Sequence, residues 1–138
     1  MKAPFPQTPR VLCVDDCLEL LSALQTTLTA YGFEVIAATN ATEALERFHA
    51  HGGQFSCVLT DHALPGGTGA CLAGQLRLAG YRGRIVVMSA ELSPPDLAAY
   101  EKAGISGFFR KPSGLPGLLA MLRMPARVPG TEPDATKE

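Results

Sequence analysis

Five residues with charged or reactive side chains directly follow short apolar runs in this 138-residue chain: Asp15, Asp16, Asp61, Ser89 and Lys111. Aspartates often occupy turns and helix caps, which would explain one of them. That explanation does not account for three carboxylates, a hydroxyl and an ammonium group that all stand in the same position relative to an apolar run. Their shared position indicates one site, provided that the runs are strands of one sheet.

Three carboxylates that lie close together repel one another and need a cation to remain ionised. Lys111 would supply one positive charge and a divalent ion two more. Mg²⁺ prefers oxygen ligands, binds through one or two carboxylates and contacts phosphate oxygens. A carboxylate in such a site can attack phosphorus and form an aspartyl phosphate. The metal, Lys111, the Ser89 hydroxyl and backbone amides would neutralise the phosphoryl oxygens.

Asp61 is the predicted nucleophile, because it stands alone after a central apolar run. The glycine-rich segment 66–69 that follows leaves its approach open. Asp15 and Asp16 are adjacent, so their side chains point in different directions and suit direct and water-mediated contacts to a metal. His62 is predicted to be a partly exposed loop residue rather than a general base.

The elements that must position these residues alternate along the chain as short β-rich runs and longer helical patterns. The predicted strands cover residues 11–14, 34–38, 57–60, 85–88 and 107–110. In the first helical pattern Leu21, Leu24, Leu28 and Tyr31 recur three and four residues apart, which predicts one buried stripe ended by Gly32. Strands apolar on both faces with helices between them indicate a doubly wound α/β fold with a parallel sheet. Ligands of such sheets bind beyond the carboxyl ends of the strands.

Composition and charge exclude several function classes. The net charge of −1 argues against a broad nucleic-acid or anionic-membrane surface. No apolar run approaches the ~20 residues of a membrane span, so we expect a cytoplasmic protein with no membrane partner. Proline-rich residues 1–9 and 125–138 are predicted to be flexible tails around one domain at 10–124. The second tail is too short for a DNA-binding domain.

Four segments of the chain are similar to motifs of the receiver domain of bacterial two-component response regulators, as found in chemotaxis receivers. They are Val14-Asp15-Asp16, residues 59–65, Met88-Ser89-Ala90 and residues 107–112. The resemblance covers about residues 10–124. It implies a flavodoxin-like three-layer sandwich with strand order 2-1-3-4-5. It also implies a phosphorelay signalling domain, not an enzyme, in which Asp61 accepts a phosphoryl group from a histidine kinase or a histidine phosphotransfer protein.

The resemblance also implies a metal site. Asp16, Asp61 and the backbone carbonyl of Ala63 would bind Mg²⁺ directly, and Asp15 would act mainly through water. None of the departures from the family pattern removes a group that this chemistry requires, although Cys17 follows the acidic pair where polar residues are frequent.

A conformational switch is a further implication of the resemblance. Ser89 would take the place of the switch hydroxyl, Phe108 that of the switch aromatic, and Lys111 would pair with the phosphate. Phe108 lacks the hydroxyl of the tyrosine that is common there, so its switching would rest on packing alone. The switched face would bind a downstream protein, and a homodimer is one further option.

Two alternatives stay open within the resemblance. The chain is either a stand-alone receiver or the receiver segment of a longer hybrid kinase or regulator. It could also be a non-phosphorylated interaction domain, although such proteins usually lose an acid or the lysine that this chain keeps. A phosphatase of the haloacid-dehalogenase type is disfavoured, because its second aspartate lies two residues after the nucleophile, where this chain has Cys17.

Overall fold

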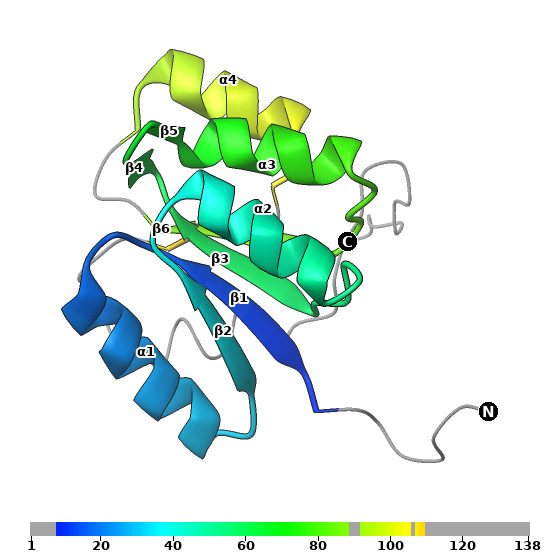
Figure 1. Cartoon of the computed structure of the whole chain (residues 1–138). Helices are drawn as coiled ribbons and strands as arrows, with labels where there is room; N and C mark the ends of the chain where they lie inside the picture. The colour runs from blue at the N-terminus through cyan, green and yellow to red at the C-terminus, as the bar shows by residue number, and fades with distance from the viewer. Residues whose placement is uncertain (1–7, 89–91, 106, 110–138) are drawn as a thin grey trace, which may run out of the picture.

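A computed structural model describes residues 8–88, 92–105 and 107–109 of the chain. A parallel five-stranded sheet with the order β2-β1-β3-β6-β7 forms its centre (Figure 1). Its strands are β1 (Arg10–Val14), β2 (Glu34–Ala38), β3 (Cys57–Asp61), β6 (Arg84–Met88) and β7 (Gly107–Phe109). Counted within this sheet alone, the order is 2-1-3-4-5, so the predicted flavodoxin-like fold is confirmed.

Helices cover both faces of the sheet. They are α1 (Leu18–Ala30), α2 (Ala41–Ala50), α3 (Gly69–Leu78) and α4 (Pro94–Lys102). Helix α1 packs against one face, α2 and α3 pack against the other, and α4 lies beside α3 (Figure 1). In the described part of the chain, no helix has both the length and the apolar character that crossing a bilayer requires.

Strand β1 shows why these strands are apolar on both faces. Leu12 and Val14 belong to the core under α2 and α3, whereas Val11 and Cys13 belong to the core under α1. All four side chains are fully buried, because successive side chains of a strand point to opposite faces and both faces are covered.

The prediction that Tyr31 belongs to the buried stripe of α1 is wrong. The helix ends before it, and Tyr31 is 54% exposed. Gly32, with a φ of 95°, reverses the chain, and the N–H of Phe33 then donates to the carbonyl of Leu28 at 3.0 Å. In this type of helix end the residue after the glycine packs back on the last turn. The buried aromatic ring is therefore that of Phe33.

Thiol labelling can test whether the strands that carry Cys13 and Cys57 are buried. Both thiols are buried in neighbouring strands, and burial raises the pKa of each, that of Cys57 to about 12. Cys17 and Cys71 are exposed. Because the thiolate is the reactive form, N-ethylmaleimide should label only Cys17 and Cys71 in the native protein and all four cysteines in denaturant. Intact mass and peptide mapping measure this outcome.

The control is the variant Cys17→Ser/Cys71→Ser, which should stay unlabelled until it is unfolded. Labelling of Cys13 at the rate of Cys17 in the native protein would contradict the two-sided burial of β1.

Candidate functional site

Three carboxylates meet at the carboxyl edge of the sheet. One oxygen from each of Asp15, Asp16 and Asp61 lies within 4.8 Å of the others. Strands β1 and β3 are parallel neighbours with Val14 opposite Thr60, so the residues that follow this pair are brought side by side. Asp15 is buried, Asp61 is half-buried and Asp16 is exposed. The structure thus assembles the acids that the sequence places after these two strands.

Backbone groups hold two of these carboxylates. Asp15 Oδ1 accepts a hydrogen bond from the N–H of Cys17 at 2.8 Å, and the N–H of Asp15 donates to the carbonyl of Ala38 at 3.0 Å. Asp61 Oδ1 accepts from the N–H of His62 at 2.9 Å. Each of these two bonds fixes one carboxylate oxygen of the cluster.

The donor set of the cluster fits a hard divalent cation. All its ligand atoms are carboxylate oxygens, which Mg²⁺ and Ca²⁺ prefer, and the exposure of Asp16 leaves room for the waters that Mg²⁺ keeps. Ala63, the predicted carbonyl ligand, is the first residue of the short strand β4 (Ala63–Leu64), two positions after Asp61.

A small antiparallel ribbon follows Asp61, where the sequence indicates only a glycine-rich loop. Strand β4 pairs with β5 (Gly67–Thr68) through a turn at Gly66, whose φ is +80°. Thr68 then caps α3 by accepting a hydrogen bond from the N–H of Cys71 at 3.2 Å. The ribbon returns the chain to the site, because the N–H of Gly69 donates to the carbonyl of His62 at 2.7 Å.

Gly69 allows α3 and α4 to approach the end of β3. A Cβ atom at this position would lie 2.5 Å from the carbonyl oxygen of Asp61 and 2.7 Å from the hydroxyl of Tyr100. Real Cβ atoms do not come this close to a backbone atom, so any side chain at position 69 must displace the strand end or the helix. The absence of a side chain is therefore part of the architecture of the site.

We expect Gly69→Ala to destabilise the protein by about 1–3 kcal/mol through this overpacking, as measured by urea unfolding. Gly74→Ala is the matched control, because Gly74 lies inside the same helix and its Cβ would meet nothing within 4 Å. That change should stabilise the protein by about 0.5–1 kcal/mol, since alanine favours a helix interior over glycine. Equal effects of the two substitutions would contradict the close approach at position 69.

His62 makes more contacts than the sequence indicates. Its side chain is only 17% exposed, and both ring nitrogens have partners on α4. Nδ1 lies 2.7 Å from the hydroxyl of Tyr100, and Nε2 lies 3.3 Å from Oδ2 of Asp96. The only local signal is that Asp96 and Tyr100 are four residues apart and thus share one face of a helix. Nothing in the sequence pairs that face with a residue 38 positions earlier.

Tyr100 and Asp96 are held in defined ionisation states. Burial raises the pKa of Tyr100, with the charges of Asp96 and Asp61 acting in the same direction, so its hydroxyl keeps its proton. Hydrogen bonds from Ser93 lower the pKa of Asp96, and His62 adds to this effect. Asp96 is therefore a carboxylate and Tyr100 a neutral donor near neutral pH.

Of the remaining predicted site residues, Phe108, Ser89 and Lys111, the structure describes Phe108 alone. Phe108, in β7, is 44% exposed, and its ring meets that of Tyr100 edge-on at 5.7 Å. Ser89 directly follows Met88, the residue of β6 that pairs in register with Asp61. Ser89 and Lys111 themselves lie outside the described residues, as do the predicted tails apart from Thr8 and Pro9.

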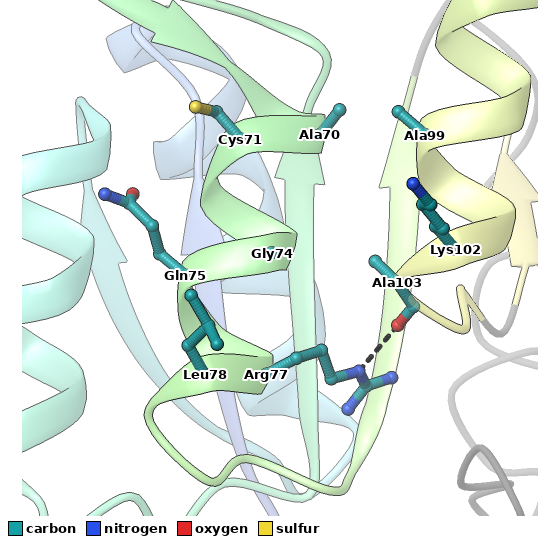
Figure 2. Close-up of a pocket in the computed structure, with 9 residues that line it drawn as sticks. All are labelled: Ala70, Cys71, Gly74, Gln75, Arg77, Leu78, Ala99, Lys102 and Ala103. Carbon is teal, nitrogen blue, oxygen red and sulfur yellow. Dashed lines mark hydrogen bonds between the residues drawn. The ribbon is translucent and has the colours of Figure 1, made fainter.

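A groove between α3 and α4 lies apart from the acidic cluster (Figure 2). Its lining is largely apolar and contains none of the carboxylates. At its floor Arg77 reaches from α3 across to the end of α4, where its Nε donates to the carbonyl of Ala103 at 2.7 Å (Figure 2). The same guanidinium also donates to the carbonyls of Gly104, Tyr81 and Gly83, which fastens this end of α4 to α3.

Comparisons with known proteins agree with this geometry. The model of the response regulator receiver domain family matches residues 11–123. The chain is 32% identical over 117 residues to the transcriptional regulatory protein KdpE of Mycobacterium tuberculosis, covering 85% of this chain and 50% of that protein. The chain spans about half the length of the curated relatives that it matches.

Two solved structures illustrate the likeness in space. The chemotaxis protein CheY4 of Vibrio cholerae superposes with a TM-score of 0.78 at 26% identity, over 84% of this chain and 97% of that one. A response regulator protein from Burkholderia pseudomallei superposes with a TM-score of 0.73 at 26% identity, over 84% of this chain and 67% of that one. The latter contains a phosphorylated aspartic acid, a calcium ion and citrate.

Proposed function

Because the chain belongs to the response regulator receiver domain family, we propose that Asp61 is its phosphoacceptor in a two-component phosphorelay. Receiver domains interact with histidine kinases and downstream effectors. The observation that carries the proposal is the cluster of Asp15, Asp16 and Asp61 within 4.8 Å at the carboxyl edge of the sheet. The donor would be a histidine kinase or a histidine phosphotransfer protein, and the target a downstream protein.

Burial and position favour Asp61 over its neighbours as the nucleophile. Asp61 is half-exposed at the end of β3, which lies between β1 and β6. Asp15 is buried and Asp16 is on the exposed side. In the transfer, a carboxylate oxygen of Asp61 forms a bond to phosphorus as the bond between phosphorus and the donor's imidazole nitrogen breaks.

The family binds Mg²⁺ in its acidic pocket, and we propose the same for this chain. Asp16, Asp61 and the carbonyl of Ala63 would be direct ligands, and Asp15 would act through water. The bound cation would neutralise the phosphoryl oxygens. The calcium ion and phosphorylated aspartic acid of the Burkholderia pseudomallei regulator support this assignment, because Ca²⁺ selects the same oxygen ligands.

The other roles in the proposal rest on the family motifs. Lys111 pairs with the phosphate, Ser89 is the switch hydroxyl and Phe108 the switch aromatic. The half-exposed ring of Phe108 against Tyr100 supports a response of β7 and α4. We propose residues 10–124 as the receiver, a signalling domain and not an enzyme. A cytoplasmic location follows from the same proposal, because histidine kinases draw on cytoplasmic ATP.

Incubation with acetyl phosphate and Mg²⁺ should add one phosphoryl group, measured by intact mass. Asp61→Asn should abolish this gain, because the amide is not a nucleophile toward phosphorus. Glu46→Gln, an exposed change of the same kind in α2, is the control and should label normally. Full labelling of Asp61→Asn together with loss of labelling in Asp16→Asn would show that the nucleophile is assigned to the wrong residue.

A separate experiment tests whether labelling requires a divalent metal ion. Labelling should stop when a chelator is added and return with Mg²⁺ or Mn²⁺, because the crowded carboxylates and the incoming phosphoryl group are all negative. Asp16→Asn should raise the Mg²⁺ concentration that gives half-maximal labelling. Undiminished labelling in chelator would exclude a metal role for the cluster.

A further inference from the structure

The residue after Asp61 joins the acidic cluster to α4. The backbone N–H of His62 donates to Asp61 Oδ1 at 2.9 Å and lies 3.2 Å from the carbonyl oxygen of Met88. The side chain of the same residue contacts Tyr100 and Asp96 of α4. One residue thus bonds the proposed phosphoacceptor, the end of β6 and a helix of the surface.

A single neutral tautomer of His62 satisfies all the side-chain contacts. In this tautomer Nε2–H donates to the Asp96 carboxylate, and Nδ1 accepts from the Tyr100 hydroxyl. Since both acceptors and both donors are paired, the ring is held in one orientation.

Further contacts hold the two partners of His62 on α4 in place. Tyr100 is fully buried, with the imidazole of His62 at 5.6 Å and the ring of Phe108 at 5.7 Å, both edge-on. Asp96 completes a capping box with Ser93 at the start of the helix. Any displacement of the His62 side chain must therefore move the first two turns of α4 or break these hydrogen bonds.

The opposite end of α4 is fixed independently. Arg77 holds the carbonyls of Ala103 and Gly104, directly after the helix, to α3 (Figure 2). With this end fastened, a movement at the His62 end would tilt the helix rather than translate it.

We propose that His62 is a positioning residue that ties α4 to the Asp61 end of β3 and carries a change at Asp61 to that helix. The second part rests on the proposed function. Formation of an acyl phosphate removes negative charge from the carboxylate that accepts from the His62 N–H, which weakens that bond relative to the one with Met88. These contacts differ between the two states of Asp61, which is what a population shift requires.

The route is distinct from the one through Ser89 and Phe108. It uses the backbone directly after the phosphoacceptor and the hydroxyl of Tyr100, a group that the switch aromatic of this chain lacks. The two routes converge at the contact between Tyr100 and Phe108.

The test compares amide NMR spectra with and without Mg²⁺ and beryllofluoride, a phosphoryl mimic. In the native sequence, shifts should appear at residues 15, 16 and 61 and extend through α4. Tyr100→Phe removes one hydroxyl and keeps the buried ring, and His62→Phe removes both ring nitrogens. In both variants the shifts at the cluster should persist while those of α4 fall to less than half.

Two further variants separate positioning from general damage. Tyr31→Phe makes the same chemical change at an exposed site and should leave the response of α4 intact. His62→Asn offers a polar atom near the position of Nδ1 and should partly restore the response that His62→Phe loses. Shifts of α4 that stay at full size in Tyr100→Phe, with beryllofluoride bound, would overturn the proposal.

Hydrogen exchange without the mimic tests the tether independently of phosphorylation. Tyr100→Phe should speed the exchange of α4 amides by roughly two- to tenfold, the effect of one hydrogen bond, and His62→Phe, which also loses the contact with Asp96, by at least as much. The double variant His62→Phe/Tyr100→Phe should add less than the product of the single effects, because the residues share one bond. A double variant whose exchange rate rises by the full product of the two single effects would contradict the proposed tether. If beryllofluoride shifts no residue of the cluster, the proposed function fails, and the tether is judged by exchange alone.

Discussion

The parallel pairing of β1 with β3 is the constraint on which this molecule depends. With Val14 opposite Thr60, the next residues of the two strands emerge side by side at one edge. Those residues are Asp15 and Asp61, and Asp16 completes the group. The backbones of Asp15 and Asp61 cannot move apart without breaking the register of two strands that are buried on both faces.

The free energy gained by burying the apolar strands is therefore linked to the repulsion among the carboxylates at the edge of the sheet. Burial of side chains such as Leu12, Leu59 and Val86 on the two faces favours the sheet that forces the carboxylates together. The negative charge of Asp61 lies near those of Asp15 and Asp16 only in the native state, where the three carboxylates repel one another. A cation that binds the assembled cluster relieves this repulsion and stabilises the native state by mass action. Ligand binding at this edge thus acts on the whole sheet.

Helix α4 is held in place by a different kind of contact from α1 and α2. Polar contacts hold it at both ends, from His62 near its start and from Arg77 of α3 just beyond its end. Tyr100 is the only residue that is buried in this helix. Elements with few buried apolar contacts are among the parts of a protein that move most readily. This helix is accordingly suited to respond to events at the end of β3.

Apart from the β4–β5 ribbon, the sequence alone determined the order and type of the described elements, because apolar strand runs and helical spacing are local chemistry. It also placed the acids at strand ends, which in a parallel sheet is enough to bring them together. The error at Tyr31 arose because spacing continues a helical stripe up to the residue before Gly32, whereas the helix itself ends at Ala30.

Only the tertiary structure decided which residues of the rest of the chain contact the polar side chains of α4. The hydrogen bond between His62 and Tyr100 joins residues 38 positions apart. The close approach at Gly69 brings the end of β3 and the hydroxyl of Tyr100, on α4, to the same point. Periodicity records which face of an element is buried but not which element covers it. Partners of single polar side chains therefore emerge only when the layers are packed.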